Sequence, residues 1–166
     1  MEPALGQDFW AGAAFLLASP LAWAALLAGV IATAGRARLS VLLGAAAAGA
    51  ALTAWLPEPA AVAAPAGVML LGTLAASRLR LHTVAAAAVA ALAGAVAGTA
   101  ADFHWATRFE WLGGLAAVMA IVATGGGLLR LLAQGPWSAW LRLGGAVLGA
   151  WIAALGGLIW LLRALL

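Results

Sequence analysis

The stretch WAGAAFLLASPLAWAALLAGVIAT, residues 10–33, decides the fold, because none of its 24 residues carries a formal charge. At a rise of about 1.5 Å per residue, a helix of this length extends for about 36 Å and can cross a hydrocarbon layer of about 30 Å with some tilt. We therefore predict that the chain enters a lipid bilayer here. Ser19 and Pro20 interrupt the stretch. Because proline removes a backbone donor, we expect a kink at this pair, and a site would be sought there first.

The composition of the whole chain also indicates a membrane protein. Of the 166 residues, 67% are hydrophobic and 8% are charged, with a mean hydropathy of +1.12. Soluble domains have about 25% charged residues. The eight arginines, without any lysine, are spread in ones and twos between apolar runs. This spacing is typical of topology signals and not of a nucleic-acid-binding stripe, so we expect no nucleic acid partner.

Apolar runs divide the chain into six predicted transmembrane helices, which we take as a single all-α domain, 1–166. We expect the spans at about 10–34, 40–56, 61–77, 83–101, 111–129 and 143–162. The absence of cysteine excludes disulfides and cysteine metal clusters. Richness in Ala, Gly and Arg without Lys indicates a GC-rich bacterial genome, so the expected location is the bacterial inner (plasma) membrane, in contact with the lipid bilayer.

The charges predict the orientation of these spans. Glu2 and Asp8 precede the first span, whereas Arg36 and Arg38 follow it, so the positive-inside rule places the N-terminus outside. With six alternating spans, both termini lie on the outer, periplasmic side. Six of the eight arginines then share the cytoplasmic side (Arg36, Arg38, Arg78, Arg80, Arg130 and Arg142), and all five acids lie outside. Only Trp23 and Trp151 fall at mid-membrane depth, away from the headgroup level that tryptophan favours.

Small residues predict how the helices pack. Because hydrophobicity cannot drive helices together in lipid, close backbone approach through small side chains has to contribute. The sixth span carries a stripe at four-residue spacing, Gly145, Gly149, Ala153 and Gly157, and the fourth carries a stripe that ends in Gly94 and Gly98. We interpret both as intramolecular contacts in preference to a dimer interface, and we predict that Gly149→Leu disrupts the fold or its assembly.

The spans hold little chemistry. None contains an ionisable residue, which is the usual marker of transport or proton relay in membranes. The polar groups at depth are hydroxyls, such as Ser19, Thr53, Thr73, Thr99 and Thr124. Such hydroxyls usually bond to carbonyls of the preceding helical turn, so we expect a structural role for each. The sequence therefore favours a protein that is not an enzyme and that carries no cofactor.

One outer loop holds a weak grouping of metal ligands. Asp102, His104 and Glu110 combine carboxylates with an imidazole, which suits divalent transition metals. Arg108 lies among them, and the three residues lie in a polar connection between spans. A solvated loop is the favoured interpretation, with a metal site as the alternative.

The chain resembles the HupE/UreJ family of membrane proteins, which are associated with hydrogenase and urease systems and regarded as nickel permeases. The family's H-P-L-x-G-x-D-H motif matches Ser19-Pro20-Leu21-Ala22-Trp23-Ala24-Ala25-Leu26, and H-G-x-A-H-G matches the segment from Ala97 to Asp102. Pro20, Leu21, Gly98 and Ala100 agree with the family pattern, whereas its histidines and its first-span aspartate are replaced. The resemblance implies the family's fold without its metal ligands.

Three functions follow, in decreasing order of preference. The first is a non-catalytic membrane subunit or assembly protein of a larger bacterial membrane complex, with other membrane subunits as partners. The second is a permease for nickel or another small solute that passes near the Ser19-Pro20 kink and the hydroxyls of Thr99 and Thr124. The third is a tryptophan-rich ligand-binding protein of the TspO type, which ranks last because that family's W-x-P and P-x-W-x-x-L-Y patterns do not occur.

Overall fold

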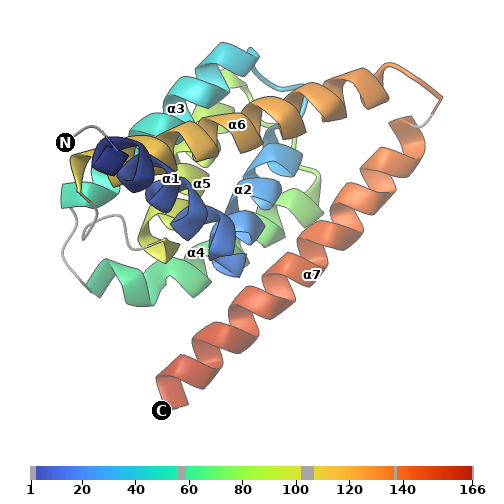
Figure 1. Ribbon diagram of the computed structural model, residues 1–166. Helices are drawn as coiled ribbons and strands as arrows, with labels where there is room; N and C mark the ends of the chain where they lie inside the picture. The colour runs from blue at the N-terminus through green and yellow to red at the C-terminus, as the bar shows by residue number, and fades with distance from the viewer. Residues whose placement is uncertain (1–2, 56–58, 102–106, 137, 166) are drawn as a thin grey trace.

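All secondary structure in the described part of the chain is helical. The structure, a computed structural model, describes residues 3–55, 59–101, 107–136 and 138–165. Its helices are α1 (Pro3–Ala18), α2 (Pro20–Thr33), α3 (Leu39–Leu52) with the 3₁₀ turn η1 (Thr53–Trp55), α4 (Pro59–Ser77), α5 (Thr83–Ala100), α6 (Arg108–Ala133) and α7 (Ser138–Leu165) (Figure 1). The predicted all-α fold class is confirmed.

Several helices are long and apolar enough to cross a membrane. Among the described residues these are α5, α6 and α7, and α1 with α2 forms a fourth if the bent pair is one span. Leu39–Trp55 and Ala63–Ser77 are shorter apolar helices. The chain therefore has the features of a membrane protein with three to four candidate spans, while the six-span arrangement and the side of the termini stay predictions.

The first apolar stretch is broken at Ser19-Pro20, where the sequence predicts a kink, and whether the bent pair forms one crossing stays a prediction. The axes of α1 and α2 meet at 75°. With 16 and 14 residues, the two helices extend for only about 24 Å and 21 Å, each less than a hydrocarbon layer of about 30 Å. Ser19, the residue at the break, has an extended backbone and hydrogen-bonds to Ala100, so the break lies level with the C-terminal end of α5.

α2 lies at the centre of the bundle. It packs on α5 and α4 and also contacts α6 and α7. The outer helices form pairs around it: α3 with α5, α4 with α7, and α1 with α6. α6 and α7 follow one another in the chain, yet they diverge from their connection and have little contact (Figure 1). This divergence leaves open space on one side of α2.

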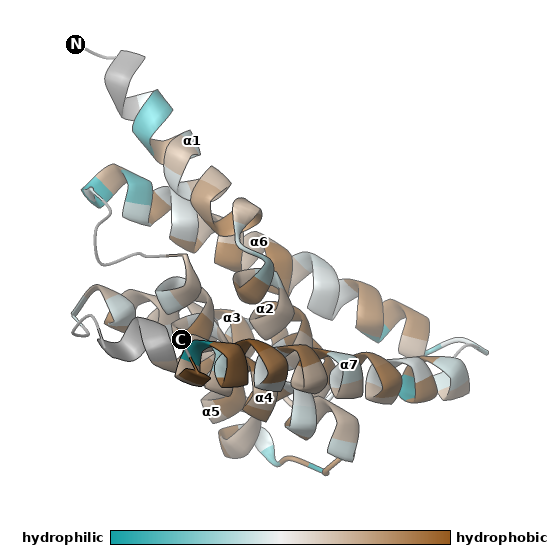
Figure 2. Ribbon diagram, turned by 90° about the horizontal axis from the view of Figure 1, so that it is seen from below, coloured by the Kyte–Doolittle hydropathy of each residue, from teal (hydrophilic) through white to brown (hydrophobic). Residues whose placement is uncertain are grey.

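The core is richer in alanine than that of a soluble protein, although leucines such as Leu16, Leu26 and Leu71 are also fully buried. Alanine is the commonest residue of the core, for example Ala22, Ala25 and Ala86 at 0% exposure, whereas leucine and tryptophan side chains point outward along α7. Soluble proteins bury their large apolar residues, because water penalises exposed apolar surface. In lipid that penalty disappears and small residues at helix contacts are favoured. Figure 2 shows that hydrophilic residues concentrate near the helix ends and connections, while apolar residues cover the helices between them.

Candidate functional site

The three metal-ligand candidates do not form a described site. Asp102 and His104 lie outside the described residues. The carboxylate of Glu110 accepts a hydrogen bond of 2.6 Å from the backbone N–H of Thr107, and the Thr107 hydroxyl accepts one of 3.4 Å from the N–H of Glu110. This reciprocal pair is a capping box, so Glu110 helps to cap the N-terminus of α6. Within the described residues, no group of three histidine, cysteine or acidic side chains is placed to hold a metal.

The Ser19-Pro20 break satisfies its own backbone groups. The Ser19 hydroxyl donates a hydrogen bond of 2.9 Å to the carbonyl of Ala100 and accepts one of 3.3 Å from the N–H of Ala22. The indole Nε1 of Trp23 donates 2.9 Å to the carbonyl of Leu17, which lies beside the break. Since lipid offers no hydrogen bonds, the bonds to the Ala22 N–H and the Leu17 carbonyl replace ones that a continuous helix would make, while the bond to Ala100 ties the break to α5. Neither Ser19 nor Pro20 lines the large cavity described below.

The predicted small residues on α5 lie at a backbone contact with α3. A side chain at Gly94 would overlap the carbonyl of Ala46, and one at Gly98 would meet the hydroxyl of Thr53. Gly49 of α3 lies just as closely against the carbonyl of Ala91. The two helices therefore interlock through glycines on both sides.

The stripe on α7 is divided between two neighbours. A β-carbon at Gly149 would lie 2.6 Å from the backbone nitrogen of Ala76 in α4. Ala153 packs on Gly72, which also belongs to α4. Gly145 instead faces the side chain of Ile31 in α2. Nearer the C-terminal end of α7, the contact with α4 is made by Gly156, where a β-carbon would lie 2.7 Å from the backbone nitrogen of Met69. Gly157 is less close, since a β-carbon there would have only the Met69 sulfur within 3.3 Å. The contact thus follows a seven-residue spacing that the four-residue pattern missed.

The threonine hydroxyls bond as expected. Thr53, Thr73, Thr99 and Thr124 each donate to a carbonyl three or four residues earlier in the chain. Ser19 is the exception, because its hydroxyl reaches a different helix. Thr99 and Thr124 do not line the large cavity, so a solute in that cavity would not meet them.

The most distinctive site is a cavity of about 1390 Å³ between α2, α4, α6 and α7. Five of the eight arginines line it, and they come from four separate parts of the chain: Arg36, Arg78, Arg80, Arg130 and Arg142. The other lining residues are mostly leucine, alanine and glycine. The sequence places these arginines on one predicted membrane face but does not reveal a shared cavity. The regular return of arginines to the predicted cytoplasmic face was the sequence signal that could have indicated the site.

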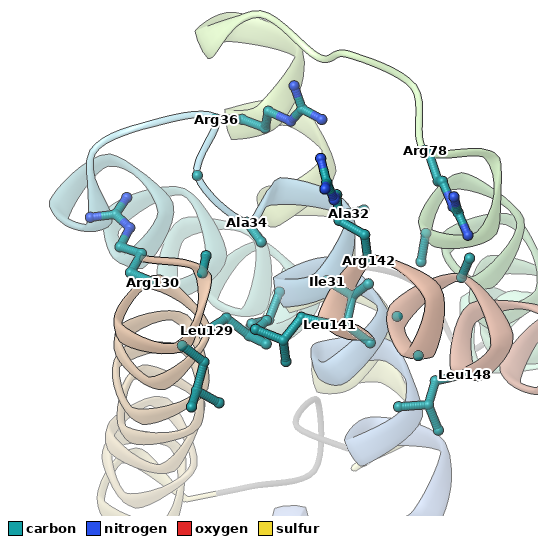
Figure 3. A pocket seen from close by; sticks show the side chains of 18 of the residues that line it. Ile31, Ala32, Ala34, Arg36, Arg78, Leu129, Arg130, Leu141, Arg142 and Leu148 are labelled. Atoms are coloured by element: carbon teal, nitrogen blue, oxygen red, sulfur yellow. The ribbon is translucent and has the colours of Figure 1, made fainter. Parts of the chain in front are cut away.

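The charged and apolar parts of the cavity are separate. Figure 3 shows the side chains of Arg36, Arg78 and Arg142 around the upper part of the cavity, with Ile31 and Leu148 below them. Arg130 turns aside, where its Nη2 donates to the carbonyl of Ala37 in the α2–α3 turn. The cavity therefore has a cationic rim and an apolar interior.

The local backbone directs two of these arginines to the rim. α2 ends before Gly35 and α4 ends before Arg78, and both residues take left-handed conformations, with φ of 70° and 54°. Such a residue commonly terminates a helix and turns the chain away, and it is usually glycine. Arg78 takes this conformation without being glycine, which costs about 1–2 kcal/mol. The turns place Arg36 and Arg78 in the lining of the same cavity.

Comparison of the chain with family models, curated proteins and solved structures finds no match. The chemistry of the site therefore rests on its own residues. Guanidinium groups stay charged at physiological pH and offer several donors in a fixed plane, which suits carboxylates and phosphates. They are poor general acids or bases for the same reason. The cavity is suited to holding an anion.

Proposed function

We propose that the chain is a non-catalytic integral membrane subunit or assembly protein of a larger bacterial inner-membrane complex. The observation that carries this proposal is Trp151, whose side chain is 66% exposed in the middle of α7. The other mid-span tryptophan, Trp23, is half-buried and hydrogen-bonded to Leu17. Trp151 has no comparable place within the bundle.

The depth of Trp151 favours a protein neighbour over lipid. α7 contains 28 residues, and Trp151 lies about 20 Å from either end of the helix. Tryptophan favours the headgroup level, where its amphipathic ring meets both lipid and water. Tryptophan is also enriched among the residues that contribute most to protein–protein binding. An exposed tryptophan at mid-depth is therefore better explained by a helix of another subunit lying against α7.

The hydrogen bonds of the polar side chains support a non-catalytic role. The threonine hydroxyls within the helices bond to their own helix, and the cavity is lined by arginines that are poor proton donors. The proposal includes the HupE/UreJ-like fold without the family's metal ligands. A permease for nickel, the alternative, has weaker support because five positive charges and no carboxylate among the described residues line the large cavity, and these charges would repel a divalent cation.

We further propose six membrane passes with both termini on the periplasmic side. The positions of charges along α6 support it, since Glu110 and Arg130 lie about 30 Å apart on this helix, close to the thickness of the hydrocarbon layer. The absence of native cysteine allows a direct test. In cells, an impermeant maleimide is expected to label Gln7→Cys and to spare His82→Cys until the membrane is opened. The reverse pattern contradicts the orientation.

Copurification tests the subunit hypothesis. The protein is extracted from its native membrane in lipid nanodiscs, and the mass and composition of the particle are measured. We expect a partner in fixed stoichiometry that is lost in Trp151→Leu and kept in Trp160→Leu, where the exposed tryptophan lies near the helix end. A particle that contains only this chain and lipid contradicts the proposal, and accumulation of nickel in cells that produce the chain would favour the permease.

A further inference from the structure

The subunit hypothesis assigns no role to the arginine-lined cavity. Five guanidinium groups share one cavity, and none of the described residues that line it is an aspartate or glutamate. In the described part of the chain the carboxylates are Asp8 and Glu110, which lie near the start of α1 and of α6. Like charges that converge without a counter-charge repel one another, more strongly beside a low-dielectric wall than in water. The cavity therefore favours an anionic occupant.

Several donors remain available to such an anion. Arg130 is bound to the Ala37 carbonyl, whereas Arg36, Arg78 and Arg142 surround the upper part of the cavity (Figure 3). Ser138, the first residue of α7, also lines the cavity, so the positive end of the helix dipole adds to the same field. Planar guanidinium groups bind phosphate oxygens in a bidentate manner. A phosphate group is the best match to this rim.

The size and lining of the cavity indicate what accompanies the phosphate. Its volume of about 1390 Å³ exceeds the range of about 300–1,000 Å³ that is usual for small-molecule sites. Ile31 and Leu148 lie away from the rim (Figure 3), other leucines such as Leu27 and Leu128 also line the cavity, and α6 and α7 diverge from their connection (Figure 1). A free inorganic anion would leave this apolar volume unused, whereas acyl chains would fill it.

We propose that the cavity between α2, α4, α6 and α7 is a binding site for an anionic phospholipid. The phosphate lies among Arg36, Arg78 and Arg142, and acyl chains extend along α6 and α7. Basic pockets between membrane helices bind anionic lipid headgroups in this manner on the cytoplasmic side, where such lipids are enriched. The lipid fills the space that the divergence of the last two helices leaves open. This inference does not depend on any protein partner.

The first test removes rim charge. The purified full chain is titrated in detergent with phosphatidylglycerol or phosphatidylcholine, and bound lipid is counted by native mass spectrometry. We expect at least tenfold preference for phosphatidylglycerol. The double variant Arg78→Gln with Arg142→Gln should lower that affinity about thirtyfold, which corresponds to about 2 kcal/mol. The matched control, Arg38→Gln with Arg163→Gln, removes the same charge from residues outside the cavity lining and should change the affinity less than twofold.

The second test fills the apolar part and keeps every arginine. Gly144 lines the cavity, and a β-carbon there has no neighbour within 4 Å, so Gly144→Trp can fold with its side chain in the cavity. Gly127 on α6 has equally open surroundings and does not line the cavity, so Gly127→Trp is the control. We expect at least tenfold weaker phosphatidylglycerol binding in Gly144→Trp only. Circular dichroism confirms that each variant is folded.

Three results would overturn the proposal. One is equal affinity for the two phospholipids, and another is equal loss in the rim and control double variants, which would indicate general surface attraction. The third concerns the source of the phosphate: if inorganic phosphate at equal concentration displaces phosphatidylglycerol and Gly144→Trp leaves binding unchanged, the site takes a free anion. Because the Gly144 variant retains all rim charges, it decides the question even if the double arginine variant does not fold.

Discussion

The two sides of α7 differ sharply within five residues. At Gly149 the helix lies so close to α4 that a β-carbon would approach the backbone nitrogen of Ala76 to 2.6 Å, whereas at Gly144 such an atom would have no neighbour within 4 Å. The first glycine lies in a tight helix contact and the second in the wall of a cavity with a rim of arginines. The comparison shows that the same residue type marks both contact and open space, so only its neighbours reveal its role.

The largest effect is expected at the close backbone contact between α3 and α5, where glycines of both helices meet carbonyl groups of the other. Gly94→Leu places a side chain on the carbonyl of Ala46, a backbone atom that cannot move aside without moving the helix. Overpacking typically costs about 1–3 kcal/mol, and we expect a loss at or above the upper value here. Thermal unfolding in mild detergent measures it. Gly44→Leu on α3, where a β-carbon has no neighbour within 4 Å, should unfold within a few degrees of the native chain.

A slightly smaller loss is expected where α7 meets α4. Gly149→Leu should cost about 2–3 kcal/mol and separate the two helices, because Ala76 and Gly72 contribute backbone atoms to the contact. Unfolding temperature and particle size in detergent report the change. Gly144→Leu, five residues earlier, is the matched substitution on the open side and should leave both unchanged. Equal behaviour of the two variants would remove the distinction between the two sides of α7.

Helix positions were predictable from the sequence because charges and prolines limit apolar runs. The predicted span 83–101 agrees closely with α5, Thr83–Ala100, and 61–77 with α4, Pro59–Ser77. The span 111–129 is shorter than α6, Arg108–Ala133. Hydropathy detects the apolar part of a helix, whereas the capping box of Thr107 and Glu110 extends it into polar sequence. The ends of a long helix therefore need local hydrogen bonds that hydropathy does not register.

The bend and the cavity were less accessible to sequence reasoning. Pro20 predicts an interruption, but the angle of 75° accompanies contacts made by distant residues, including the bond between Ser19 and Ala100 and the packing of α1 on α6. The arginines of the cavity are separated by as many as 106 positions, from Arg36 to Arg142. Topology places them on one face, but only the divergence of α6 and α7 brings them around a common space.

Loss of the hydroxyl at the bend should have an intermediate effect. Ser19→Ala removes both the bond to the Ala100 carbonyl and the cap of α2, and it leaves a carbonyl that lipid cannot satisfy. We expect a destabilisation of about 2 kcal/mol, from a cap worth about 1 kcal/mol and a hydrogen bond of similar value. Thermal unfolding measures it. Thr73→Val removes a hydroxyl that bonds only within its own helix and should cost less than half as much. Equal losses would mean that Ser19 makes no special contribution.

The smallest effect, at Arg78, separates stability from binding at the open side of α7. Its φ of 54° is unfavourable for a residue with a β-carbon, so Arg78→Gly should stabilise the lipid-free protein by about 1 kcal/mol while removing a rim charge. Arg80→Gly removes another lining charge from a residue without positive φ and should give no such gain. In phosphatidylglycerol the native chain should regain the stability that it lacks relative to Arg78→Gly, because the stabilisation by bound lipid rises with the logarithm of the affinity. Unfolding temperatures of the three proteins, measured with and without the lipid, should therefore change their order. If Arg78→Gly and Arg80→Gly change the unfolding temperature equally with and without the lipid, the left-handed conformation of Arg78 makes no contribution to lipid binding. It then only terminates α4.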